Sequence, residues 1–195
     1  TQAMLFKLIK LSNKQEFLHE VVSLSSIGET GERIASLGIS VKCLEMKRPW
    51  HLATGAFQLA RHIKRFAPDV VQTWLYHADL LGLIAGKWAS APNVVWNVRC
   101  SDMSTAYTTG TRRLLVSTLR RLSHIPTAII TNSKAGKEWH STLGYDPKRW
   151  VIIPNGFDIA SFRPNTAARS KIRAELGLSR DALLVGLIAR YDPIK

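Results

Sequence analysis

Short apolar runs alternate along the chain with longer segments in which apolar residues recur every third or fourth position. The short runs predict buried β-strands, and the segments with helical spacing predict amphipathic helices. The predicted strands cover residues 20–25, 39–46, 69–75, 93–98, 128–133, 151–153 and 182–189, and the predicted helices cover residues 2–11, 29–37, 52–66, 80–88, 111–123, 134–143 and 166–176. Regular alternation of strand and helix predicts an α/β fold with a Rossmann-like, doubly wound parallel sheet flanked by helices.

The pattern changes where the predicted strand 151–153 runs into a turn. Its residues are all β-branched, which is typical of a strand covered on both faces, and Pro154 ends it because proline cannot donate a ladder hydrogen bond. We expect Asn155 and Gly156 to reverse the chain, since both residue types tolerate positive φ. Asp158 is expected to accept hydrogen bonds from backbone amides two residues further on. This stretch is predicted to be a rigid junction between two α/β units.

The residues Ile-Pro-Asn-Gly-Phe-Asp-Ile-Ala-Ser-Phe-Arg-Pro at 153–164 resemble a known signature. It precedes the second domain of glycosyltransferase family 4, the group 1 retaining glycosyltransferases with the GT-B fold. Further on, an apolar run ends at Arg190, and Lys195 follows five residues later. In the family, an Arg and a Lys with this spacing hold the donor diphosphate, although the Gly that usually precedes the Arg is Ala189 here. The resemblance therefore implies that Arg190 and Lys195 bind the diphosphate.

The resemblance covers the whole chain and implies its domain organisation. Residues 1–153 correspond to an N-terminal, acceptor-binding Rossmann-like domain, residues 154–181 to the junction and connecting helix, and residues 182–195 to the start of a truncated C-terminal donor-binding domain. In the family, a first strand and a Gly-Gly loop precede the first helix, so we expect the first strand of the sheet to be missing. The main catalytic residues, including a Glu pair that grips the donor, are expected beyond Lys195. The chain alone is therefore expected to be inactive.

The family transfers a hexose from a nucleotide diphosphate sugar to a glycan or lipid-linked acceptor, retains the anomeric configuration and generally needs no metal or other cofactor. Negative charge grows on the leaving diphosphate, and two cations at Arg190 and Lys195 would stabilise it. Two other functions stay open. One is a GT-B sugar-nucleotide epimerase, which needs no acceptor. The other is a non-catalytic, basic Rossmann-like module that binds anionic membrane or RNA.

Composition adds an unusual charge to this picture. The 195 residues are 46% apolar and contain 27 Lys and Arg against 14 Asp and Glu, a formal net charge of +13. This excess favours phosphorylated partners or an anionic membrane surface. Cys43 and Cys100 have no metal-type spacing and are expected to be reduced, which indicates a cytoplasmic protein. No apolar run approaches the ~18 residues of a transmembrane helix.

Polar residues at two predicted helix starts are candidates for lining a cleft. Thr1 and Gln2 begin the first helix, where backbone amides attract phosphate or carboxylate, although an ordinary helix start explains them equally well. His77 follows the predicted strand 69–75, and ligands gather at the carboxyl ends of parallel strands. A structural histidine is the alternative for His77. Asp79 either joins the same site or stabilises the helix N-terminus.

A polar cluster, Arg99, Cys100, Ser101 and Asp102, follows the next predicted strand at the same edge of the sheet. Family members often carry a His here that lines the acceptor side of the cleft and contacts the transferred sugar. Cys100 occupies the position of that His, so its role cannot be carried over. Arg99, Ser101 and Asp102 remain the candidates. An ion pair between Arg99 and Asp102 that only holds the loop is the alternative.

The predicted helix 111–123 carries four arginines opposite its apolar face. They are Arg112, Arg113, Arg120 and Arg121. Anionic lipid headgroups are the first interpretation, since each basic residue near such a surface contributes roughly 1 kcal/mol, and the protein would then be peripheral on the inner face of the membrane. A merely solvated face comes second. Nucleic acid comes last, because the sequence has neither an interleaved aromatic platform nor a nucleic-acid fold signature.

Overall fold

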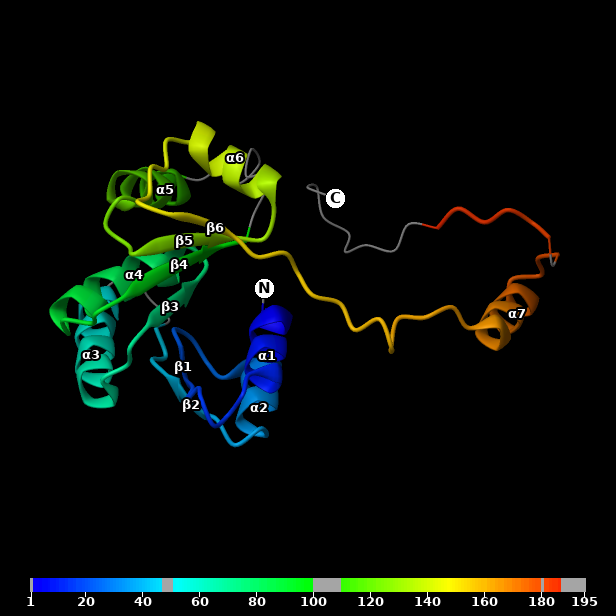
Figure 1. The fold of residues 1–195 in the computed structure, drawn as a ribbon, viewed down its shortest axis with the longest axis horizontal. Coiled ribbons are helices and arrows are strands. Elements are labelled where there is room, and N and C mark those ends of the chain that lie inside the picture. Colours follow the sequence, from blue (N-terminus) through cyan, green and yellow to red (C-terminus); the bar gives the residue numbers. More distant parts are fainter. Residues whose placement is uncertain (1, 47–50, 100–109, 180, 187–195) are drawn as a thin grey trace. The chain divides into compact units, whose positions relative to one another are not determined.

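The computed structural model describes residues 2–46, 51–99, 110–179 and 181–186 (Figure 1). The chain divides into two compact units, Thr1–Asn155 and Gly156–Lys195. The elements of the first unit are α1 (Gln2–Leu11), β1 (Glu20–Ser23), α2 (Gly28–Ala35), β2 (Ser40–Cys43), α3 (His51–Phe66), β3 (Val71–Trp74), α4 (Tyr76–Trp88), β4 (Val94–Val98), α5 (Gly110–Leu122), β5 (Ala128–Thr131), α6 (Lys134–Thr142) and β6 (Trp150–Ile152). The second unit contains α7 (Thr166–Glu175).

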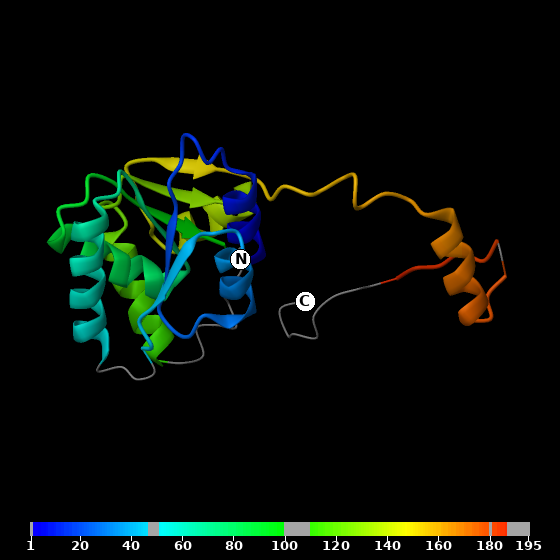
Figure 2. The ribbon, with the colours of Figure 1, turned by 90° about the horizontal axis from the view of Figure 1, so that it is seen from below.

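The strands of the described part pair in parallel and form two sheets. β1 pairs with β2, and the second sheet has the order β3-β4-β5-β6. In a doubly wound sheet of order 3-2-1-4-5-6, strand 1 separates strand 2 from strand 4. Without strand 1, that order leaves a pair, 3-2, and a group of three, 4-5-6. The pair matches β2-β1 and the group matches β3-β4-β5, and β6 is one further strand beside β5. Helices flank them, and Figures 1 and 2 show α1 and α2 side by side next to β1 and β2. The predicted parallel α/β fold is confirmed.

Side-chain alternation along β4 decides where the core lies. Val94, Trp96 and Val98 point to one face of the sheet and are at most 5% exposed. On that face they pack with Ile129 of β5 and Leu119 of α5. A second apolar cluster joins α3 to α4. Because α4 contributes residues to both clusters, it connects them.

Helix α4 approaches the sheet closely because two of its glycines face the strands. A Cβ atom on Gly82 would lie 2.3 Å from Cγ2 of Thr73, and one on Gly86 would lie 2.7 Å from Cγ2 of Val94. Both strand side chains are buried, so neither can move aside. We expect Gly82→Ala to lower the free energy of unfolding by about 2 kcal/mol, because α4 must shift off β3. Urea unfolding would measure this, and Gly110→Ala is the control, since no other part of the described chain outside its own helix comes within 4 Å of its added Cβ. Equal stability of the G82A variant and the wild type would contradict the close packing.

A polar cluster connects the sheet of β1 and β2 to α3. The Glu20 carboxylate lies 3.1 Å from Lys42 Nζ and 3.0 Å from His62 Nε2, and it accepts a hydrogen bond from Ser40 Oγ at 2.9 Å. Lys42 also donates to His62 Nδ1 at 3.1 Å. Burial raises the pKa of Glu20, but the hydrogen bonds from Lys42 and Ser40 outweigh it, so the pKa falls below its usual value. Glu20 therefore stays ionised and holds the small sheet against α3.

Helix α4 begins earlier than predicted. The sequence pattern predicts a start at residue 80, but α4 starts at Tyr76, directly after Leu75. Leu75 has φ 79° and ψ 154°, a backbone conformation that ends β3 and turns the chain into the helix within one residue. The spacing of apolar residues along the sequence does not predict such a sharp turn.

The corner after β6 also differs from the prediction. Neither Asn155 nor Gly156 has a positive φ, so the expected reversal at this pair is wrong. The turn comes just after Asp158, whose Oδ1 accepts hydrogen bonds from the amides of Ala160 at 3.1 Å and Ser161 at 3.2 Å. The predicted hydrogen bonding of Asp158 is confirmed. The turn forms here because one carboxylate satisfies both amides.

Helix α7 is held by local hydrogen bonds. Asn165 caps its start by accepting a hydrogen bond from the Ala168 amide at 2.9 Å. Beyond its end, the buried Arg173 donates to the carbonyl oxygens of Ser179 and Ala182, both at 2.6 Å. These bonds fold the segment after α7 back onto the helix.

The predicted strand 182–189 is wrong over residues 182–186, which form no strand, and residues 187–189 lie outside the described part. A buried strand needs a neighbouring strand and apolar cover. The described part of the second unit offers no other strand, and most of its large apolar side chains are exposed. Phe157, Ile159, Phe162, Leu183 and Val185 are each at least 71% exposed.

Candidate functional site

Trp74, Arg99 and Asn155 meet where three parallel strands end, and we call them the edge cluster. The Arg99 guanidinium lies over the Trp74 ring, 5.3 Å from its centroid. Arg99 Nη2 donates a hydrogen bond to Asn155 Oδ1. Arg99 is half-buried, and burial lowers the pKa of its guanidinium, which remains charged at neutral pH. The cluster thus presents a positioned cation on an aromatic surface.

Strand geometry explains why these three residues meet. Trp74 is the last residue of β3, Arg99 directly follows β4, and Asn155 stands shortly after β6. Because the strands are parallel, their carboxyl ends lie at one edge of the sheet. The Ile153 amide donates to the Thr131 carbonyl oxygen at 2.8 Å, which keeps the chain at this edge beyond β6. In open parallel sheets, this is the edge at which ligands bind.

His77 lies in the first turn of α4, three residues after Trp74, and its side chain is exposed. This is the position predicted for it at the carboxyl end of β3. The intervening Leu75 has φ 79°, which costs a non-glycine residue roughly 1–3 kcal/mol. Such strain persists only where the surrounding structure enforces it. The short segment around Leu75 carries both the Trp74 ring and the His77 imidazole.

The start of α4 is anchored by a buried histidine that the sequence pattern does not single out. His140 Nδ1 donates to the Gly136 carbonyl oxygen at 2.7 Å, and its Nε2 lies 2.8 Å from the Tyr76 hydroxyl. Burial lowers the pKa of His140, while the hydrogen bond to Gly136 opposes this. The ring is therefore neutral, and Nε2 accepts the proton of Tyr76. This bond ties α4 to α6 next to Leu75.

Asp79 lies below the edge rather than at its surface. Its side chain is 0% exposed, and its Oδ1 accepts a hydrogen bond from Thr73 Oγ1 at 2.5 Å. Burial raises the pKa of Asp79 to about 7, against the opposing hydrogen bonds from Thr73 and from the Asn97 backbone amide. Its Oδ2 has no hydrogen-bond partner among the described residues. Asp79 is thus a structural link between the first turn of α4 and the sheet.

Gln2 is the other described candidate from the sequence. It begins α1, and its Oε1 accepts a hydrogen bond from Thr30 Oγ1 at 3.4 Å. Thr30 lies in the first turn of α2, which follows β1, so Gln2 lies on the carboxyl-end side of β1. The remaining predicted site residues, Thr1, Ser101, Asp102, Arg190 and Lys195, lie outside the described residues. Within the described part, the partner of Arg99 is Asn155 rather than an acid.

The described part of the edge offers a guanidinium, an imidazole and side-chain amides. These groups bind hydroxyl and phosphate oxygens. Among the described residues, no group of three or more His, Cys, Asp or Glu side chains is placed to hold a metal ion. None of the helices in this part of the chain has the length and apolar character needed to cross a membrane.

Residues 11–161 match the model of a protein family described as Glycosyltransferase Family 4. The chain belongs to glycosyltransferase family 4. The match ends within the corner after β6, so it includes every residue of the edge cluster and nearly all of the first unit. The recognition of the chain as a member of this family from its sequence is thereby confirmed.

Two curated relatives are similar to parts of this family 4 chain. A putative glycosyltransferase, EpsF, of Bacillus subtilis is 28% identical over 117 residues, which are 57% of the chain and 29% of the relative. A D-inositol 3-phosphate glycosyltransferase of Kineococcus radiotolerans is 34% identical over 68 residues, which are 34% of the chain and 15% of the relative. The matches thus span less than a third of the length of either relative.

A solved structure supports the fold of this family 4 chain. The crystal structure of Anabaena HepE in complex with UDP and glucose matches with a TM-score of 0.66 at 20% sequence identity. The match covers 90% of the chain and 46% of HepE. At this identity the likeness shows the fold, which is the Rossmann-like, GT-B type of a glycosyltransferase.

Sequence reasoning did not place Trp74 and Asn155 among the site residues of this family 4 chain. Asn155 stands in the family signature, where the sequence indicates only a turn residue. Trp74 ends a predicted strand, and a large aromatic residue just before a polar helix start is the signal that could have identified it. Their pairing with Arg99 depends on contacts across many residues of sequence, which only the structure provides.

Proposed function

We propose that the complete protein is a retaining hexosyltransferase and that this chain supplies its acceptor side. The observation that carries the proposal is the edge cluster. A cation stacked on Trp74 and held by Asn155 stands at the ligand-binding edge of a family 4 domain. The enzyme would move a hexose from a nucleotide diphosphate sugar to a glycan or lipid-linked acceptor, with retention of configuration and without a bound cofactor.

Each group has a role in this proposal. Arg99 binds hydroxyl or phosphate oxygens of the acceptor or of the transferred sugar, because a guanidinium donates several hydrogen bonds in a fixed fork. His77 and Gln2 line the same edge, together with Thr1, Ser101 and Asp102. Arg190 and Lys195 neutralise the charge that grows on the leaving diphosphate. The chain alone is inactive, since the residues that grip the donor lie outside it.

We place the protein in the cytoplasm, peripheral to the inner face of the membrane. All four arginines of α5, namely Arg112, Arg113, Arg120 and Arg121, are exposed. Leu114 is 70% exposed and lies seven residues before Arg121, on the same side of the helix. An exposed apolar side chain beside cations suits an anionic membrane surface, which would present a lipid-linked acceptor.

The donor is tested by thermal-shift titration of the complete protein with UDP, GDP and ADP and their sugars. UDP comes first, because the HepE structure contains UDP. A ligand that binds only the native state at 100 times its Kd adds about 2.7 kcal/mol, which raises Tm by several degrees. We expect one nucleotide to do so, and we expect the 195-residue chain to show no such shift.

Three results would contradict the proposal. No shift with any nucleotide would favour the basic anion-binding module. Conversion of the sugar nucleotide without an acceptor would favour an epimerase. Sugar transfer by the 195-residue chain alone would show that the donor-binding residues proposed to lie outside it are not needed. The anomeric configuration of the product, read by NMR, tests retention separately.

A further inference from the structure

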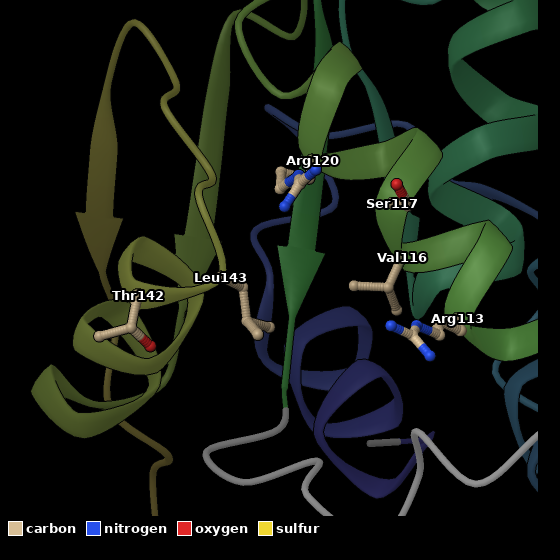
Figure 3. Close-up of a pocket in the computed structure, with 6 residues that line it drawn as sticks. All are labelled: Arg113, Val116, Ser117, Arg120, Thr142 and Leu143. Carbon is tan, nitrogen blue, oxygen red and sulfur yellow. The ribbon is translucent and has the colours of Figure 1, made fainter.

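A groove of about 570 Å³ lies between α5 and the end of α6. Its lining comes from these two helices and the residue after α6. The lining residues are Arg113, Val116, Ser117, Arg120, Thr142 and Leu143. Figure 3 shows both arginines on α5. It also shows the side chains of Val116 and Leu143 pointing toward one another between the helices. The groove thus has cationic walls and an apolar floor.

Helix geometry separates the four arginines of α5 into two pairs. Arg113 and Arg120 are seven residues apart and lie on one side of the helix, about 10 Å from each other along its axis. Arg112 and Arg121 lie about 80–100° to either side, and they do not line the groove. The basic helix is therefore not uniform, and of these four arginines only Arg113 and Arg120 line the groove.

The side chain of Arg120 is held in position by a glycine. A Cβ on Gly144 would lie 2.9 Å from Cδ of Arg120, so the stem of the arginine packs directly over this residue. Gly144 has φ 88°, a conformation that favours glycine. The turn after α6 and the cationic wall therefore depend on the same position.

The cations of the groove are not neutralised within the described part of the chain. None of the described residues that line the groove is acidic, and neither Arg113 nor Arg120 forms an ion pair with another described residue. Ser117 adds a hydroxyl group, whereas the Thr142 hydroxyl already donates to the Trp139 carbonyl oxygen at 2.7 Å. Two guanidinium groups and a hydroxyl around one space are the donor set that phosphate oxygens require.

We propose that the groove between α5 and α6 binds the phosphate or diphosphate group of a phosphorylated ligand. The ligand arrives either free in solution or as a lipid headgroup, and the apolar floor of Val116 and Leu143 suits carbon next to the phosphate. The described lining of the groove shares no residue with the edge cluster, so pyrophosphate binding tests the groove separately from sugar transfer. Arg113 and Arg120 also belong to the four arginines proposed to face the membrane, and a lipid headgroup in the groove would rest on that proposal.

Inorganic pyrophosphate is the first probe, titrated calorimetrically into the 195-residue chain. The test variant is Arg113→Gln with Arg120→Gln, and the matched control is Arg112→Gln with Arg121→Gln. Both pairs remove two charges from the same exposed helix, so the net charge and the helix propensity change equally. We expect the Kd for pyrophosphate to rise about tenfold or more in the test variant and less than about twofold in the control. Circular dichroism and Tm show that both variants fold.

A second arm identifies the source of the phosphate. Vesicles of phosphatidylcholine with and without phosphatidic acid are sedimented with each variant. A loss of binding confined to the Arg113 and Arg120 pair assigns the groove to a lipid headgroup, and an equal loss in both pairs assigns it to a free phosphate compound. The proposal is overturned if pyrophosphate does not bind, or if both pairs weaken pyrophosphate binding equally.

Discussion

Asp79→Asn is expected to remove a large part of the pH dependence of stability. In the wild type, burial raises the pKa of Asp79 to about 7 from an ordinary value of 3.8. Asparagine keeps an oxygen that accepts the hydrogen bond of Thr73 but cannot ionise. The variant therefore keeps the shape of the link between α4 and β3 and loses its titration.

The raised pKa of Asp79 makes the wild type less stable as the pH rises. Because the folded-state pKa is raised, the contribution of Asp79 to the free energy of unfolding is fully present below about pH 4. It is lost as the pH rises to about 7. A shift of about three pKa units corresponds to about 4 kcal/mol in total. Between pH 5 and pH 8, the wild type should lose about 3 kcal/mol relative to the Asp79→Asn variant.

Urea unfolding at several pH values measures the difference. All six tryptophans lie within residues 1–155, so tryptophan fluorescence reports the unfolding of the first unit. His140 and Glu20 titrate in both proteins, and subtraction of the two curves removes their contributions. Asp69→Asn, which removes an exposed carboxyl group, is the charge-matched control. Parallel curves for wild type and Asp79→Asn would show that Asp79 is not the buried titrating group.

Asp79 also shows how far sequence reasoning reaches. Its place in the first turn of a helix after a strand was predictable from the pattern, but its burial was not. Burial follows from Gly82, which lets α4 approach Thr73, and the chain has no periodicity that reports this approach. In the same way, the positive φ of Leu75 moved the start of α4, because a strained corner leaves no trace in apolar spacing.

The parallel sheet itself could be predicted because strands and helices alternate strictly, and parallel strands need such crossovers. That prediction already placed the ends of β3 and β4 at one edge, with His77 and Arg99 on it. It could not pair Arg99 with Trp74 or Asn155, since contact across strands depends on register and on the path after β6. The strand predicted at 182–189 failed over 182–186, where apolar residues without a partner strand stay exposed.

Arg99→Ala is expected to lower kcat/KM for sugar transfer by the complete protein about 100-fold or more, the usual effect of removing a positioned hydrogen-bond donor from a catalytic site. The guanidinium is already placed by Trp74 and Asn155, so little order is lost when it binds oxygen atoms. Arg99→Lys should recover little, because an ammonium group cannot stack flat on Trp74 or donate in a fork. Arg61→Ala, which removes an exposed arginine from α3, is the control.

Variants of Trp74 and Asn155 distinguish a binding role of Arg99 from a structural role. If Arg99 acts on the substrate, Trp74→Phe should keep most of the activity, since an aromatic face remains, and Asn155→Ala should raise KM through a less ordered guanidinium. If Arg99 only holds the corner after β6, Arg99→Ala and Asn155→Ala should lower Tm equally and leave the activity of the folded enzyme unchanged. Steady-state kinetics below the Tm of each variant, with Tm measured on the same samples, distinguishes these two patterns. A wild-type kcat/KM for Arg99→Ala would remove the edge cluster from the acceptor site.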